Sequence, residues 1–211
     1  MSKARELYNS VKTFSQAVNG CKPFDRHIMN PGRCSFIIGQ VASEMLECVQ
    51  GHIQPTKSAV LLEQIDASVD AMYYIADTAA RHGYGPGSKG IEPLGFDPTL
   101  EPMSSDDVKR FAKYVTTSMM DLAFNHQWTM EDQEDFLWRI FLSIRNKLLI
   151  NTGADAFDYF EIVHNANLSK LNADGTPISV REDGKIMKPE GFVPPNAIMA
   201  ALIEEQMMVK A

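Results

Sequence analysis

Two neighbouring stretches decide the fold: residues 33–51, RCSFIIGQVASEMLECVQG, and residues 56–82, TKSAVLLEQIDASVDAMYYIADTAARH. Apolar residues recur at helical spacing on nearly every side of both, which predicts two helices that are buried on most sides. The connection between them is short enough to make them antiparallel neighbours. The sequence therefore predicts a helical bundle built around this pair.

Each of the two predicted helices carries a narrow line of acidic residues: Glu44 and Glu47 in the first, and Glu63, Asp66 and Asp70 in the second. Spacings of three, four and seven residues hold each set on one helical face. Residues 34–80 contain six acidic residues and one base, Lys57. Crowded carboxylates in an apolar setting require a cation, and oxygen ligands suit Mg²⁺, with Mn²⁺ as a substitute.

A solvated acidic face is the alternative interpretation of the same residues. Most pairs of glutamates three residues apart on a helix simply face water. The repetition of the pattern on two adjacent apolar helices favours a metal site, but spacing alone leaves both interpretations open.

Composition limits the classes of protein that the chain can belong to. Its 211 residues, 45% of them hydrophobic, are enough for one domain (1–211) with a sizeable core. A net charge of −7 disfavours nucleic acid as a partner. Three cysteines without a C-x-x-C pattern indicate a reducing compartment, and we find neither a signal segment nor a run long enough to span a membrane. We expect a cytoplasmic protein, in the host cytoplasm if the chain is viral, with no membrane partner.

The remaining segments also read as helices. We predict helices over residues 3–18, about 105–126, about 130–150, 156–171 and 196–210, with Ser104, Thr129 and Asp155 as start signals. Only residues 176–188 alternate, around a turn at Asp183–Gly184, which predicts a small C-terminal β-hairpin. The predicted fold class is all-α, a helical bundle with this one hairpin.

Four motifs resemble one enzyme superfamily when they are taken together and in order: SEMLE (43–47), DAMYYIADTAARHG (70–83), VHNANLSKLNADG (163–175) and REDGKIMKPEGFVPP (181–195). They are similar to the all-α NTP pyrophosphohydrolases, the MazG-like and phosphoribosyl-ATP pyrophosphohydrolase-like enzymes, including phage-type MazG-like members. The resemblance places the core in residues 1–84 and 155–195 and makes about 85–154 a helical extension, with residues 196–210 as a C-terminal helix.

The resemblance implies a fold, a reaction and a set of site residues. Members cut a nucleoside triphosphate between its α and β phosphates with Mg²⁺, assemble as homodimers or homotetramers, and bury the carboxylate helices in a four-helix core. It assigns metal binding to Glu44, Glu47 and Asp70 and substrate contacts to Asn165, Asn167, Lys170, Lys185 and Lys188. A general likeness to phage-type members also suggests a preference for purines such as (d)GTP.

One departure from the family pattern leaves the second ligand pair open. Ala67 stands where the family has a glutamate. Either Asp66 with Asp70 or Glu63 with Asp66 then supplies the pair, and Asp66 or Glu63 orients the attacking water. The departure also keeps open a catalytically inactive nucleotide-binding relative.

A second alternative is a carboxylate-bridged, di-iron-like bundle. It rests on Glu161-x-x-His164, a ligand pair that such bundles use in two copies, of which this chain has one. We interpret His164 as a core or capping histidine instead.

Overall fold

The structure is a computed structural model that describes residues 2–20, 23–87, 99–125, 127–179 and 186–209. These residues form seven α-helices and one 3₁₀ turn: α1 (Lys3–Val18), α2 (Pro31–Gln50), η1 (Gly51–Ile53), α3 (Lys57–Arg81), α4 (Ser105–Phe124), α5 (Met130–Thr152), α6 (Ala156–Leu168) and α7 (Pro195–Val209). No strand occurs in the described ranges, so the predicted all-helical class is confirmed.

Side-chain caps fix the helix starts where the sequence signals predicted them. Thr56 accepts a hydrogen bond from the backbone N–H of Ala59 at the start of α3, and Ser104 caps α4 in the same way. Thr129 and Asp132 form a reciprocal capping box on α5. Each cap satisfies backbone donors that a helix leaves unpaired at its first turn, which is why short polar residues mark these positions in the sequence.

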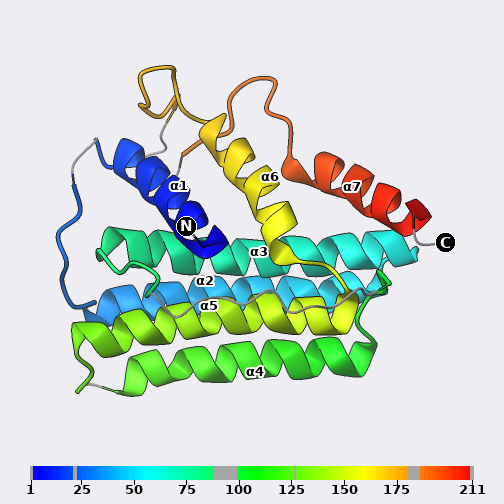
Figure 1. Ribbon diagram of the computed structural model, residues 1–211, viewed down its shortest axis with the longest axis horizontal. Coiled ribbons are helices and arrows are strands. Elements are labelled where there is room, and N and C mark those ends of the chain that lie inside the picture. Colours follow the sequence, from blue (N-terminus) through cyan, green and yellow to red (C-terminus); the bar gives the residue numbers. More distant parts are fainter. Residues whose placement is uncertain (1, 21–22, 88–98, 126, 180–185, 210–211) are drawn as a thin grey trace.

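Helix α3 is the centre of the molecule. It contacts α2, α5, α1, α6 and α7. Figure 1 shows α2, α3, α4 and α5 side by side with similar axial directions, while α1, α6 and α7 cross obliquely on the other side of α3. Its buried residues, among them Ile65, Val69 and Met72, therefore meet apolar side chains on most sides, as its nearly continuous hydrophobicity predicts.

The segment predicted as an extension contributes to the same core. Helices α4 and α5 pack against α2 and α3, respectively. Their buried side chains, such as Phe111 and Phe141, belong to the hydrophobic cluster that also contains Leu61 and Ile65 of α3. Residues 99–154 thus support the carboxylate helices directly. The four-helix core that the resemblance implies remains a prediction.

The turn of the predicted C-terminal hairpin, Asp183–Gly184, lies outside the described residues. Beside it, Leu171 and Pro177 form an isolated antiparallel bridge, and the backbone N–H of Met187 donates to the carbonyl of Ser179 at 2.9 Å. None of the helices in the described part of the chain is long and apolar enough to cross a membrane.

Gly51, where α2 gives way to the turn before α3, is required by a close approach. A Cβ atom at this position would lie 2.3 Å from Cβ of Glu63, which is fixed to the α3 backbone. We therefore expect Gly51→Ala to lower the free energy of unfolding by about 1–3 kcal/mol, measured by urea denaturation, because the turn has to move away from α3.

Gly39 is the matched control for this substitution. It lies within α2, and a Cβ there meets nothing within 4 Å. Gly39→Ala should raise the free energy of unfolding by about 0.5–1 kcal/mol, because alanine restricts the unfolded chain. Equal effects at both glycines would contradict the steric explanation.

Candidate functional site

The carboxylates of α2 and α3 converge at the face where the two helices pack. Glu44 is 8% exposed and Glu47 lies on the exposed side of the same helix, while Asp66 and Asp70 are half-buried on α3. The packing of α2 against α3 brings the two predicted acidic lines together, and each carboxylate lies within electrostatic range of others in the set.

The pKa values of these groups reflect both burial and their mutual repulsion. Burial and, in smaller measure, the charges of Asp70, Glu47 and Asp66 together raise the pKa of Glu44 to about 8. Burial, and then Asp66, raises the pKa of Asp70 to about 7. Both shifts favour the neutral acid, so without a cation the full set of negative charges is unfavourable at neutral pH.

Asp66 and Glu63 continue the set along α3. Burial raises the pKa of Asp66, and Glu47 raises it further, against a hydrogen bond that lowers it. Burial also raises the pKa of Glu63, with smaller contributions from Asp66 and Glu47. Asp66 and Asp70 both raise the pKa of Glu44, whereas Glu63 interacts, within this set, only with Asp66 and Glu47 and so lies at the edge of the cluster.

A cavity of about 260 Å³ opens over the α3 carboxylates. Asp66 and Asp70 lie on one wall, and Asn167, Lys170 and Lys188 lie on the other. Helix α6 ends at Leu168, and Lys170 in the turn after it lines the same cavity as the α3 carboxylates. Lys170 and Lys188 lower the pKa of Asp70, which shows that their charges act on it. Three predicted substrate-binding residues thus face two predicted carboxylates.

Phe192 holds the two lysines of this cavity in position. The Nζ atoms of Lys170 and Lys188 lie 5.5 Å and 5.2 Å from the centroid of its ring. Lys170 also donates a 2.6 Å hydrogen bond to Oδ1 of Asn167. Ammonium groups over an aromatic face keep their charge while losing conformational freedom. The lysines are therefore ordered before any anion arrives.

Asn196 is a site residue that the sequence reasoning missed. Its Nδ2 donates a 2.8 Å hydrogen bond to Oδ2 of Asp66, 130 positions earlier in the chain. The Pro194–Pro195 pair ends the extended segment and begins α7, which brings Asn196 over α3. The only signal in the sequence is that Asn196 directly follows the GFVPP motif.

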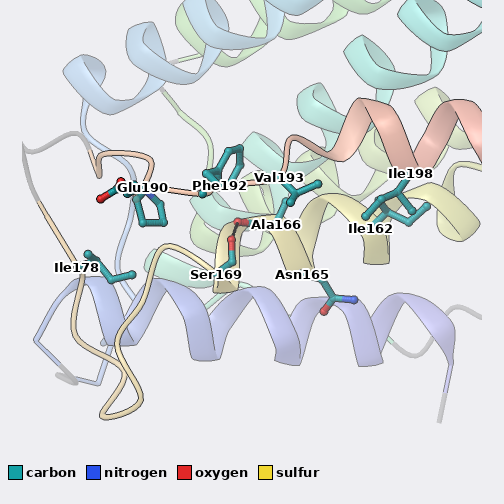
Figure 2. A pocket seen from close by; sticks show the side chains of 11 residues that line it. Ile162, Asn165, Ala166, Ser169, Ile178, Glu190, Phe192, Val193 and Ile198 are labelled. Atoms are coloured by element: carbon teal, nitrogen blue, oxygen red, sulfur yellow. Dashed lines mark hydrogen bonds between the residues drawn. The ribbon is translucent and has the colours of Figure 1, made fainter.

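One predicted substrate-binding residue, Asn165, does not line this cavity. Asn165 lines a separate, mostly apolar groove of about 560 Å³ between α6, α7 and residues 189–193, and Figure 2 shows its amide directed away from Phe192. Asn165 lies two positions before Asn167, so the helical turn carries it to another face of α6. Lys185 lies outside the described residues.

The donor chemistry of the cluster fits Mg²⁺, since all of its ligands are carboxylate oxygens. Nevertheless, no group of three or more His, Cys, Asp or Glu side chains stands close enough together to hold a metal within the parts of the chain that the structure covers. Ala67, at the departure from the family pattern, is 4% exposed and belongs to the core. Its position faces the packed interior, while Asp66 and Asp70 face the cavity.

Glu161 and His164, the basis of the di-iron alternative, differ in their surroundings although they are neighbours on α6. The side chain of Glu161 is 66% exposed and lies 4.0 Å from Nζ of Lys3. His164 is buried, and its Nδ1 lies 3.2 Å from the hydroxyl of Tyr73. His164 is therefore a core histidine in a hydrogen bond, whereas the carboxylate of Glu161 faces solvent.

Comparison with known proteins identified no significant match to the chain. No protein-family model matches the chain, and neither a curated protein nor a solved structure matches it significantly. The assignment to the all-α NTP pyrophosphohydrolases therefore rests on the four sequence motifs and stays a prediction.

Proposed function

We propose that the chain is a metal-dependent nucleoside triphosphate pyrophosphohydrolase, which converts a (d)NTP and water to a (d)NMP and diphosphate. The main support for the proposal is that acidic and basic side chains line the same cavity. Asp66 and Asp70 lie on one wall and Lys170 and Lys188 on the other. A polyphosphate needs cationic contacts, which the lysines supply. The carboxylates can approach the phosphates only if metal cations lie between the two.

Mg²⁺, or Mn²⁺ in its place, would be held by Glu44, Glu47, Asp66 and Asp70, with Glu63 beside Asp66. When bound, the ion supplies charge neutralisation at the phosphate oxygens and activates water. The raised pKa values of Glu44 and Asp70 support this assignment, because they mark an anionic site that lacks its counter-charge.

Side chains of the protein bind the phosphates and orient the groups of the site. Lys170 and Lys188 bind phosphate oxygens, and Phe192 keeps both ammonium groups in place. Asn196 donates to Oδ2 of Asp66 and so fixes the orientation of this carboxylate, which would bind the cation or orient the attacking water. Asn167 orients Lys170 through its side-chain oxygen.

Self-association is part of the proposal. Helix α2 leaves large apolar side chains in water beside the acidic line: Phe36 is 48% exposed and Leu46 is 57% exposed. Two such residues on the helix that carries Glu44 and Glu47 support a homodimer or homotetramer in which this face is covered.

The identity of the products tests the proposed reaction. Purified protein incubated with each (d)NTP and Mg²⁺ should release nucleoside monophosphate and diphosphate in equal amounts, as measured by ion-exchange chromatography. Chelation with EDTA should abolish the reaction, and excess Mg²⁺ should restore it, because the carboxylates cannot bind a polyphosphate alone.

Two outcomes of this assay contradict the proposal in different ways. Release of nucleoside diphosphate and inorganic phosphate would show that the wrong bond has been assigned. Binding of a (d)NTP in calorimetry without any product would instead identify the chain as an inactive nucleotide-binding relative, the alternative that Ala67 keeps open.

A further inference from the structure

A second cavity adjoins the carboxylate cavity and extends toward α1. Its volume is about 320 Å³, and its lining residues are Phe14, Val18, Asp70, Tyr73, Tyr74, Asp77, Arg81, Asn167, Lys170 and Ile186. Asp70, Asn167 and Lys170 line both cavities, so the two spaces meet at the proposed phosphate site. The second space is therefore within reach of a ligand whose phosphates contact Lys170.

The walls of the second cavity suit a flat aromatic ring. Phe14 and Tyr73 are paired edge to face, and Tyr73 also stacks on Phe160, so these two rings form a fixed wall. Tyr74 is half-buried and pairs with no other ring in the described part of the chain. Its side chain lines the cavity, so a ligand ring there can contact it at little entropic cost, because the helix holds its backbone.

Arg81 supplies the polar contact of this cavity. Its Nε donates a 2.8 Å hydrogen bond to Oδ2 of Asp77, one helical turn earlier. Its two terminal nitrogens make no hydrogen bond to any described residue, and its guanidinium lies 5.8 Å from the ring of Phe24. The guanidinium is thus anchored at one edge, while its other edge presents donors.

Hydrogen bonds to both of its carboxylate oxygens hold Asp77 in position. Its Oδ1 accepts from the hydroxyl of Ser15 at 2.5 Å, and its Oδ2 accepts from Arg33 at 3.4 Å as well as from Arg81. Asp77 is therefore a positioning residue for Arg81. Arg81 thus adds two terminal nitrogens, both of them donors, to the lining of this cavity.

We propose that this cavity binds the nucleobase of the triphosphate and that Arg81 selects bases that present two neighbouring hydrogen-bond acceptors. The O6–N7 edge of guanine and the N3–O2 edge of cytosine have this arrangement. Neither adenine nor thymine presents two adjacent acceptors, because the 6-amino group of adenine and the N3–H of thymine are donors beside their acceptors. A planar guanidinium discriminates such edges strongly when both of its hydrogen bonds form. This inference rests on the proposed hydrolysis, since it uses the same phosphate site.

The test compares kcat/KM for dGTP, dCTP, dATP and dTTP in the wild type and in Arg81→Lys. We expect dGTP or dCTP to exceed both dATP and dTTP by about tenfold to a hundredfold in the wild type. Lysine keeps the charge and the pairing with Asp77 but lacks the fork, so the preference should fall below about threefold. Which of the two bases is preferred distinguishes the purine from the pyrimidine edge.

A substrate analogue tests the base contact from the side of the ligand. If guanine is the base, 7-deaza-dGTP, which lacks the N7 acceptor, should lose about tenfold in kcat/KM in the wild type. It should lose nothing further in Arg81→Lys. If cytosine is the base, dCTP should instead lose its advantage over dTTP only in Arg81→Lys.

The outcomes that overturn this inference differ from those that overturn the proposed function. Equal losses for all four nucleotides in Arg81→Lys would make Arg81 a phosphate contact, and equal rates in the wild type would remove base selection, with hydrolysis intact in both cases. If no nucleotide is hydrolysed, calorimetry with α,β-imido-dGTP, α,β-imido-dCTP and α,β-imido-dATP still ranks the bases. If the affinities differ between the bases but nothing is hydrolysed, only the proposed reaction is refuted. If the affinities are equal, the base site is refuted.

Discussion

Asp70→Asn should reduce the rate of (d)NTP hydrolysis by at least about 10²-fold and, at the same time, stabilise the metal-free protein at pH 8. The loss of rate is expected because Asp70 lies at the junction of the two cavities, opposite Lys170, and an amide cannot balance a bound cation. The gain in stability is expected because the charge that asparagine removes is half-buried among other acids.

The sign of the stability effect follows from the direction of the pKa shift. Folding raises the pKa of Asp70 from 3.8 to about 7, so the fold favours the protonated form. The native state is therefore penalised progressively as the pH rises from about 4 to about 7, and the penalty is complete at pH 8. Asparagine carries no such penalty, so we expect a gain on the order of 2 kcal/mol at pH 8 and little at pH 4.

Urea denaturation with EDTA at pH 4 and pH 8 measures this difference, and Asp121→Asn is the matched control. Asp121 lies on the exposed face of α4, far along the chain from either cavity, so its substitution should change neither the rate nor the stability by much. Full activity in Asp70→Asn would remove Asp70 from the site. Equal stability of Asp70→Asn and the wild type at pH 8 would contradict the buried charge.

Asp155→Ala should lower the free energy of unfolding by about 3–5 kcal/mol, the largest change in stability that we expect from one surface-accessible residue. Arg145, whose side chain is 6% exposed, donates through Nε and Nη2 to the two carboxylate oxygens of Asp155 at 2.7 Å and 2.5 Å. Asp155 also caps α6 through the N–H of Phe157. Alanine removes the cap and leaves a buried guanidinium without its counter-charge.

Two further variants distinguish the buried pair from an ordinary ion pair. Glu101→Ala removes the partner of Lys57, whose side chain is 68% exposed, and should cost less than about 1 kcal/mol. Adding Arg145→Met to Asp155→Ala should recover most of the loss, because no buried charge then remains unpaired. If Asp155→Ala costs no more than Glu101→Ala, the pair behaves as a surface ion pair and our explanation is wrong.

Local sequence patterns predict the helices well because local interactions decide where they begin. Thr129 and Asp132 satisfy each other's backbone donors over three residues, and Asp155 needs only Phe157 two positions later. Such caps act in the isolated segment as they act in the protein. The sequence pattern for residues 85–154 did not reveal, however, that α4 and α5 would share the core of α2 and α3.

The acidic face could also be predicted from the sequence, because helical geometry alone places Asp66 and Asp70 one turn apart. The residues on the opposite wall of the site could be predicted from the sequence only in part. Lys170 and Lys188 came from the resemblance, and Asn165 was assigned with Asn167 although the turn of α6 sends it to another groove. Spacing along the chain gives the face of a helix but not the helix that it meets.

What the sequence by itself determined is therefore the set of helices and the line of carboxylates on two of them, because both depend on residues within a few positions of one another. Only the tertiary structure decided what those carboxylates face. Asn196 reaches Asp66 across 130 positions, and Arg81 is anchored beside a cavity whose walls come from α1, α3 and the turn after α6. Burial and long-range packing set these distances and the raised pKa values, and neither is encoded in local spacing.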